Sequence, residues 1–171
     1  MPTEISGSTG VNKIQDATVV AADIASSVPL GKVLQVVQTS HSTSTAFTST
    51  SWIAQGASAV ITPTSTSSKI LISAIVHRKH DSMSGNDSGV GYRWNRNSTN
   101  IWESTITADY EYPGGGSERQ EIRGWVPLSY LDSPNTTSAT TYYLWARKHS
   151  GATITFNSND PTIITLMEIA G

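Results

Sequence analysis

The chain has 171 residues, 37% of them hydrophobic, which suits one domain, because a domain of this size buries roughly 68–70% of its unfolded surface. Charged residues make up only 14% and the formal net charge is −2, which argues against electrostatic binding of nucleic acid. The absence of Cys excludes disulfides, thiolate catalysis and Cys-ligated metal sites. Neither a signal peptide nor an apolar run of membrane-spanning length is found, so we expect neither export nor membrane insertion.

An N-terminal arm is predicted over residues 1–29, because this segment has too few apolar side chains to form a core. One or two helical turns around Ala21 would be marginal in water without a docking surface. Pro29 favours extended backbone at Val28, and Gly31 allows a bend, so the domain boundary is placed here. We expect the arm to need a partner. Its candidate anchoring and oligomerisation residues are Val11, Ile14, Val19, Val20 and Ile24.

The sequence predicts one all-β head domain over residues 30–171. Apolar residues alternate with period two or form short runs, and turn residues separate them. The runs at Ile70–Ile72 and Ile163–Leu166 do not alternate, which predicts inner strands covered on both faces or nearly so. The expected fold is a jelly-roll-like antiparallel β-sandwich. The predicted strands are Lys32–Gln38, Trp52–Gln55, Ala59–Ile61, Lys69–Arg78, Gly89–Asn95, Gln120–Val126, Thr140–Lys148 and Ile163–Ile169, with weaker candidates at Trp102–Thr105 and Ala152–Phe156.

The best metal candidate is the stretch His77 to Asp81, which holds two imidazoles and a carboxylate. On a strand His77 and His80 point to opposite faces, so they cannot bind one ion together. A strand that ends in a solvated loop explains the stretch more simply. We therefore predict no metal site and no cofactor.

Catalysis is not expected, since the chain lacks the motifs of serine hydrolases, nucleotide-binding loops and dinucleotide folds. A pair of carboxylates could hydrolyse polysaccharide if it flanked a groove. The acids near the glycine-rich segment are more simply its solubilising charges. They are Glu103, Asp109, Glu111, Glu118 and Glu121.

A cluster of aromatic and arginine residues gives the most suggestive polar pattern. Aromatic faces stack on sugars or on partner side chains, and Arg and Asn supply planar donors. Strand alternation predicts that Trp94 is buried and that Arg93 faces the other way, while Tyr110 and Tyr112 beside glycines are exposed. Trp125 and Trp145 are expected to pack within their strands. The candidate contacts to a host or partner are Arg93, Arg96, Trp102, Tyr110 and Tyr112.

Several segments together resemble short tail-fibre-like virion proteins of tailed bacteriophages of the cyanophage type. Each segment alone is rich in Ser and Thr and low in information, but their order and spacing span nearly the whole chain. The segments are TEISGSTGVNKIQD (3–16), SVPLGKVLQVVQ (27–38), ITPTSTSSKILI (61–72), LDSPNTTSATTYY (131–143) and ITLMEI (164–169).

The resemblance implies a structural protein of the virion, assembled in the host cytoplasm, with no catalytic motif. It implies a homotrimer whose arms intertwine or dock onto other virion proteins, while the head domain attaches to the host surface, with a host glycan as a further partner. A capsid decoration or head-fibre protein is the first alternative, because it would use the same design. An enzyme acting on polysaccharide is the second.

Overall fold

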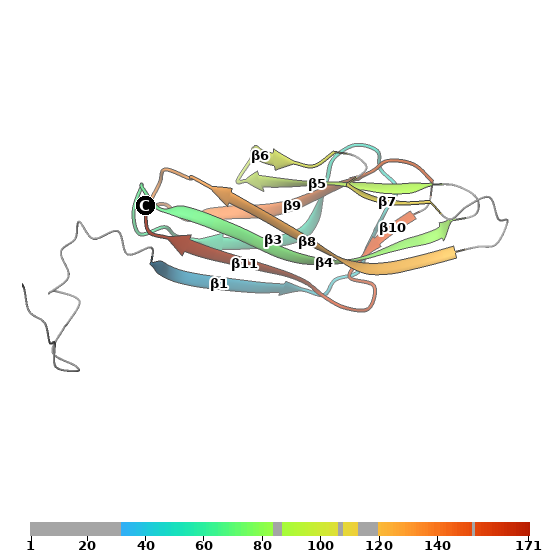
Figure 1. Cartoon of the computed structure of the whole chain (residues 1–171), viewed down its shortest axis with the longest axis horizontal. Helices are drawn as coiled ribbons and strands as arrows, with labels where there is room; N and C mark the ends of the chain where they lie inside the picture. The colour runs from blue at the N-terminus through green and yellow to red at the C-terminus, as the bar shows by residue number, and fades with distance from the viewer. Residues whose placement is uncertain (1–31, 84–86, 106–107, 113–119, 152) are drawn as a thin grey trace, which may run out of the picture. The chain divides into compact units, whose positions relative to one another are not determined.

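The computed structural model describes residues 32–83, 87–105, 108–112, 120–151 and 153–171, which form eleven strands and no helix (Figure 1). The predicted arm, with its five candidate anchoring residues, lies outside the described residues. So do residues 113–119, which include Glu118. The strands are β1 (Val33–His41), β2 (Thr45–Phe47), β3 (Ile53–Ile61), β4 (Lys69–Met83), β5 (Ser88–Arg96), β6 (Thr99–Glu103), β7 (Asp109–Glu111), β8 (Gln120–Asp132), β9 (Thr140–Lys148), β10 (Thr153–Phe156) and β11 (Thr162–Ile169).

The first sheet, sheet A, is built around the long strand β4. Along one edge β4 pairs with β8, and along its other edge it pairs first with β11 and then with β10. The outermost row consists of β1, which pairs with β11, and β2, which pairs with β10. All these pairings are antiparallel. Pro127 fits in β8 because β8 is an edge strand, where a missing N–H costs no ladder hydrogen bond.

The second sheet, sheet B, has the order β3, β9, β5, and then β6 and β7 along the free edge of β5. When the collinear strands β1 and β2, β6 and β7, and β10 and β11 are each counted as one, eight strands remain. Numbered 1 to 8 along the chain, these strands have the order 1-8-3-6 in sheet A, which is β1/β2, β10/β11, β4 and β8. In sheet B the order is 2-7-4-5, which is β3, β9, β5 and β6/β7. This is the strand order of a jelly roll, so the expected fold class is confirmed.

The core lies between the two sheets and takes side chains from both. Trp94 and Tyr92 of β5 are fully buried, as is Phe156 of β10, and the rings of Tyr92 and Phe156 stack with centroids 6.0 Å apart. Phe47 of β2 packs edge-on against Phe156 at 5.1 Å. The prediction that Trp94 is buried is therefore confirmed. Aromatic residues from both sheets hold the layers together.

Most predicted strands are present, with three differences. The segments predicted separately around residues 52–61 form one strand, β3, whose register shifts at Gly56, where the backbone has φ +76°. The short strands β2 and β7 were not predicted, because three residues carry too little periodicity. The stretch His77 to Asp81 is not a strand end, since β4 continues to Met83.

The apolar runs of β4 and β11 lie in inner strands of sheet A, as predicted, but their outer side chains are not fully covered in the single chain. Ile70 and Ile72 are fully buried, but Ile75, which points to the other side of sheet A, is 45% exposed. Leu71 and Ile163 on that outer side are only half-buried. The periodicity correctly indicated apolar side chains on both faces. It could not indicate that no other part of the described chain covers the second face.

Candidate functional site: the apolar outer face of sheet A

The outer surface of sheet A carries apolar side chains across four strands, in two clusters separated by a polar row of Gln38, Thr165, Ser73 and Ser129. Cross-strand pairing brings its members side by side: Leu71 pairs with Met167 on one edge of β4 and with Leu131 on the other, and Met167 pairs with Val36. We call this surface the apolar face. It consists of Val36, Leu71, Ile75, Trp125, Leu131, Ile163 and Met167.

Several large side chains of the apolar face are strongly exposed to solvent. Val36 is 57% exposed, Trp125 49% and Leu131 46%. Ile75, Trp125 and Ile163 line an open hollow of about 370 Å³. Single exposed apolar residues are ordinary, but a contiguous group of this kind marks an interaction surface. Trp125 was expected to pack within its strand, and that expectation is wrong.

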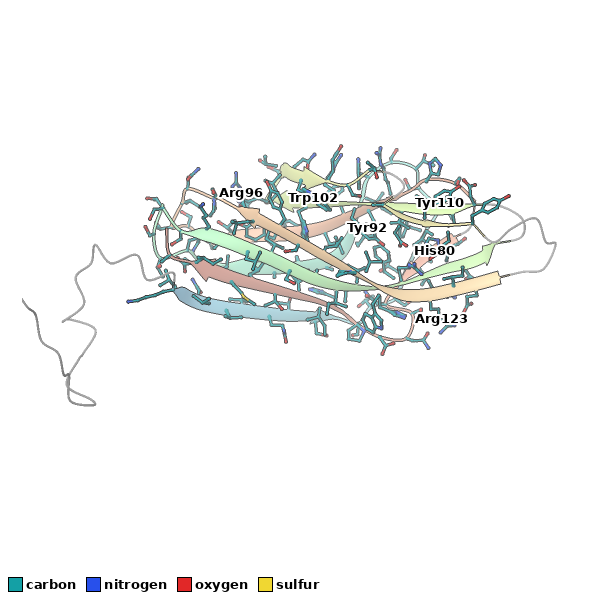
Figure 2. All side chains as sticks on the ribbon, in the orientation of Figure 1. His80, Tyr92, Arg96, Trp102, Tyr110 and Arg123 are labelled. Carbon is teal, nitrogen blue, oxygen red and sulfur yellow. The ribbon has the colours of Figure 1, made fainter. Side chains whose placement is uncertain are left out.

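A row of charged residues borders the apolar face at one end. Lys79 of β4 contacts Asp81 at 3.1 Å and Glu121 at 3.5 Å, and Arg123 of β8 contacts Glu121. Figure 2 labels Arg123 on this side of the molecule. Two cations and two anions alternate, so the row is close to neutral. At this end the apolar face is therefore not bordered by an excess of one sign of charge, and at its other end the exposed Lys69 lies two residues before Leu71 on the same side of β4.

The candidate contact residues predicted from sequence do not form one site. Figure 2 places Tyr110 at one end of the sandwich and Arg96 and Trp102 toward the other. Tyr110 and Tyr112 are 44% and 68% exposed, as predicted, and Tyr110 donates a hydrogen bond to Asp87 at 2.6 Å. Arg93 lies on the outer surface of sheet B and pairs with Glu103.

Arg96 and Trp102 are turned toward the space between the sheets. Arg96 contacts both carboxylate oxygens of Asp132 at 3.0 Å, and Tyr142 donates to the same carboxylate at 2.7 Å. Trp102 packs against the core, with its ring 6.3 Å from that of Tyr130. In the described chain both side chains therefore have structural contacts that sequence reasoning missed.

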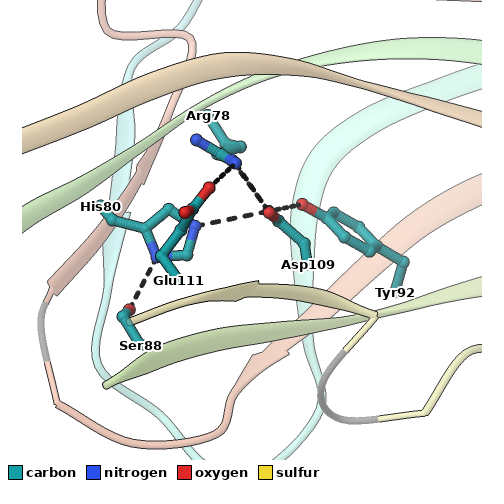
Figure 3. Close-up of polar contacts among 6 residues, drawn as sticks. All are labelled: Arg78, His80, Ser88, Tyr92, Asp109 and Glu111. Atoms are coloured by element: carbon teal, nitrogen blue, oxygen red, sulfur yellow. Dashed lines mark hydrogen bonds and ion pairs between the residues drawn. The ribbon is translucent and has the colours of Figure 1, made fainter. Parts of the chain in front are cut away.

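A buried polar network lies between the sheets (Figure 3). Arg78 binds both carboxylate oxygens of Asp109, at 2.9 and 2.8 Å, and also contacts Glu111 at 2.8 Å. Tyr92 donates to Asp109 at 2.8 Å, and His80 lies 3.4 Å from it. Asp109 is only 8% exposed, so it is not a solubilising surface charge as expected. Sequence gave no signal for this network, because its members come from β4, β5 and β7.

The network includes Ser88, His80 and Asp109 in a chain of contacts, which raises the question of a nucleophile. The Oγ atom of Ser88 lies 2.7 Å from Nδ1 of His80, and Nε2 of His80 faces Asp109. Both Ser88 and His80 have no exposed surface. A nucleophile must reach its substrate, and this hydroxyl cannot. The arrangement acts as a structural cross-link of β4, β5 and β7.

Electrostatics stabilise the ionised form of Asp109. Burial alone would raise its pKa, but hydrogen bonds from His80, Arg78 and Tyr92 and the charge of Arg78 outweigh burial and lower the pKa to about 2. Burial, together with the Asp109 charge, raises the pKa of the Tyr92 hydroxyl well above its ordinary value. At neutral pH Asp109 is therefore charged and Tyr92 is a neutral donor.

A second buried carboxylate, Glu168 of β11, ties a loop to sheet A. It accepts hydrogen bonds from the backbone N–H and hydroxyl of Thr64, both at 2.7 Å, and from Gln35 at 2.6 Å. Burial would raise its pKa, but the hydrogen bonds from Gln35, Ser68 and Thr64 lower it to about 2. The carboxylate thus supports the loop between β3 and β4.

Within the described ranges, no group of three or more His, Asp or Glu residues could hold a metal ion. His77 and His80 point to opposite sides of β4, as predicted: His80 is in the interior network, and the His77 ring lies 4.9 Å from that of Trp125 on the outer side. The described part of the chain also has no helix that could span a membrane.

Comparison with known proteins gives no family for the chain. No family model matches it, and no curated protein matches it. Among solved structures it is similar to the infectious bursal disease virus VP2 subviral particle, with a TM-score of 0.41 and 14% identity over 80% of this chain and 37% of that one. It is also similar to the structure of the infectious bursal disease virus Gt strain, with a TM-score of 0.44 and 13% identity over 80% and 38% of the two chains. The chain spans less than two fifths of these proteins, and likeness at this level carries no argument about function.

Proposed function

We propose that the chain is a structural component of a tailed-phage virion, a trimeric tail-fibre protein that assembles through the apolar face and attaches the particle to its host. The observation that carries the proposal is the exposure of the apolar face on the single chain. Its side chains have the size of those in an interface core. The resemblance of the chain to tail-fibre-like virion proteins supports the phage context.

We assign the apolar face to contact between copies of this chain. A face that meets its own copies must avoid like-charge repulsion, and at one end of this face Lys79, Asp81, Glu121 and Arg123 compensate one another, while Lys69 stands at the other end. Three copies around a threefold axis would bring three such faces together. Obligate assemblies commonly bury roughly 2,000 Å² or more.

The arm over residues 1–29 has a separate part in this proposal. Its thinly spread apolar residues, Val11, Ile14, Val19, Val20 and Ile24, would be covered in the assembled particle, by other copies or by another virion protein. Deletion of the arm should abolish incorporation into particles while the head domain still folds. Incorporation at the normal level without the arm would contradict this assignment.

Light scattering of the purified full-length chain tests the assembly. We expect a trimer for the natural chain and a folded monomer for the double variant Ile75→Asp, Trp125→Asp. The matched control is Val60→Asp, because Val60 is 49% exposed on the outer side of sheet B. It should leave the trimer intact. A natural chain that is monomeric at micromolar concentration would contradict the proposal.

A capsid decoration protein would use the same interface and remains the alternative. Cryo-electron microscopy of the particle distinguishes the two functions by position. Density for the chain on the tail supports the proposed function, and density on the capsid shell supports the alternative. No catalytic step is assigned to the chain in either case.

A further inference from the structure

We infer that the outer surface of sheet B binds an acidic oligosaccharide, through a strip of alternate residues on β9. The strip runs from Tyr143 through Trp145 to Arg147, which all point outward because alternate residues of a strand share a face. The inference deepens the proposed function and rests on it for its biological meaning. The host ligand of sheet B would then be an acidic oligosaccharide.

The first half of the strip is an aromatic groove. Tyr143 and Trp145 line an open hollow of about 510 Å³ together with Ala54, Asn97 and Ser98. This volume is in the range of small-ligand sites. Aromatic rings beside amide and hydroxyl groups suit a sugar, which has an apolar ring face and hydroxyls at its rim. The groove is thus matched to a carbohydrate better than to an apolar ligand.

The amides beside the groove have unused hydrogen-bonding capacity. Asn97, at φ 50°, accepts a hydrogen bond from the Thr141 N–H through Oδ1, and none of the described residues accepts from its Nδ2. Asn95 pairs across the ladder with Tyr143 and is only 7% exposed, yet its Oδ1 has no partner among the described residues. The Oδ1 atom of Asn95 is inaccessible and does not line the groove, so an ordered water would satisfy it, whereas Asn97 lines the groove and its Nδ2 can donate to a ligand.

The second half of the strip carries an uncompensated positive charge. The guanidinium of Arg147 lies over the ring of Trp52, 4.5 Å from its centroid, and Arg93 lies 4.2 Å from the same ring. Arg93 is neutralised by Glu103, at 2.7 and 3.0 Å. In the described chain Arg147 has no carboxylate partner, and its buried Nε has no hydrogen-bond partner. The other described arginines, Arg78, Arg93, Arg96 and Arg123, all contact a carboxylate.

Because Arg147 has no carboxylate partner in the described chain, the ligand that it would bind is negatively charged. An arginine held over an aromatic ring is ordered before binding and can donate from its terminal nitrogens to an incoming carboxylate. Trp145 and Arg147 lie about 7 Å apart along the strand. One sugar ring on Trp145 can therefore place a carboxylate, on itself or on its neighbour, near Arg147. A uronic or sialic acid residue has this chemistry.

The test measures binding of tetragalacturonate and sialyllactose to the full-length chain by isothermal titration calorimetry, with neutral maltotetraose as the comparison. We expect at least one acidic saccharide to bind and maltotetraose to bind about tenfold more weakly or not at all. Trp145→Ala and Tyr143→Ala should each weaken acidic binding about tenfold or more, and Arg147→Gln should remove the preference for acid. The control Arg123→Gln, on sheet A, should bind normally.

Circular dichroism establishes whether each variant is folded. If Trp145→Ala does not fold, Tyr143→Ala tests the aromatic groove in its place. Failure of both acidic saccharides to bind at millimolar concentration would overturn the inference, as would unchanged binding by folded Arg147→Gln and Tyr143→Ala. Light scattering on the same samples separates the two proposals. A trimer that binds no acidic saccharide contradicts only this inference, and a monomer that binds one contradicts only the proposed assembly.

Discussion

At the scale of residues, the stability of the sandwich depends on charges buried between its sheets. Arg78 and Asp109 are almost inaccessible and bind each other through two parallel hydrogen bonds. A pair of this kind contributes little when it is compared with a well-packed apolar pair, but removal of one partner leaves a buried charge without compensation. Loss of the buried pair should therefore lower the free energy of unfolding more than loss of an exposed ion pair on sheet A.

Asp109→Ala should destabilise the domain by about 3–5 kcal/mol, because it leaves the buried Arg78 with only the partly exposed Glu111 as a partner and removes the acceptor of Tyr92. The matched control is Glu121→Ala, which removes an exposed partner of Arg123, and it should cost far less, because solvent screens exposed ion pairs. Urea unfolding followed by tryptophan fluorescence measures both. Similar costs for the two variants would show that the buried network is not coupled to the fold.

The buried carboxylate of Glu168 makes stability depend on pH in a defined direction. Its pKa falls from an ordinary value of 4.5 to about 2 on folding. The unfolded chain therefore takes up the proton first, so the stabilisation is present above pH 4.5 and is lost as the pH falls from there to about 2. Asp109, with a pKa also lowered to about 2, acts in the same direction.

Glu168→Gln should be less stable than the natural chain at pH 7, by about 1–3 kcal/mol, because an amide cannot accept all the hydrogen bonds from Thr64 and Gln35. The difference should shrink below pH 4, since the natural chain loses its advantage there. Free energies of unfolding at pH 7, 4 and 2.5 measure the effect. A constant difference across this range would contradict the role of the ionised carboxylate.

At the scale of elements, β4 determines how the two faces of sheet A are used. Ile72 points into the core and is fully buried, whereas Ile75 points outward and is 45% exposed. Ile72→Ala should cost about 2–5 kcal/mol in the free energy of unfolding, since it opens a cavity. Ile75→Ala should leave the core intact and weaken association between copies.

Thermal unfolding at several protein concentrations distinguishes these two outcomes. For Ile72→Ala the midpoint should fall at every concentration. For Ile75→Ala the midpoint should fall most at low protein concentration, because the weakened association between copies is lost there first. A midpoint for Ile75→Ala that equals that of the natural chain at all concentrations would argue against an interface on the apolar face.

The sequence was sufficient to predict the elements with strong periodicity. The range Thr140–Lys148 was predicted with the bounds that the structure gives β9, and the burial of Trp94 followed from alternation in β5. The short strands β2 and β7 were missed because each pairs with a distant segment and has little pattern of its own. Local pattern does not encode such long-range pairing.

The candidate sites were harder to predict than the fold. Apolar residues at alternate positions of β4 could have indicated the apolar face, since Leu71 lies between the buried Ile70 and Ile72, and Ile75 between the buried Ala74 and Val76. The strip on β9 gave a weaker signal, because Trp145 in a regular strand is as compatible with a core. The partner of an arginine cannot be found from sequence, so the isolation of Arg147 required the structure.

At the scale of the whole molecule, the two sheets have outer surfaces of different chemistry. The outer surface of sheet A carries two clusters of large apolar side chains, whereas that of sheet B carries aromatic residues, amides and an arginine without a carboxylate partner in the described chain. This division fits a protein that assembles through one sheet and displays the other. Fold alone does not assign function, and the proposal depends on these surfaces.

Accessibility of single cysteines tests the central claim most directly, because the natural chain has no Cys. Ile75 and Val60 are 45% and 49% exposed in the single chain, on the outer sides of sheet A and sheet B. If the apolar face is buried between copies, Ile75→Cys will react with maleimide far more slowly than Val60→Cys under native conditions, and equally fast in urea. Equal rates under native conditions would contradict the account.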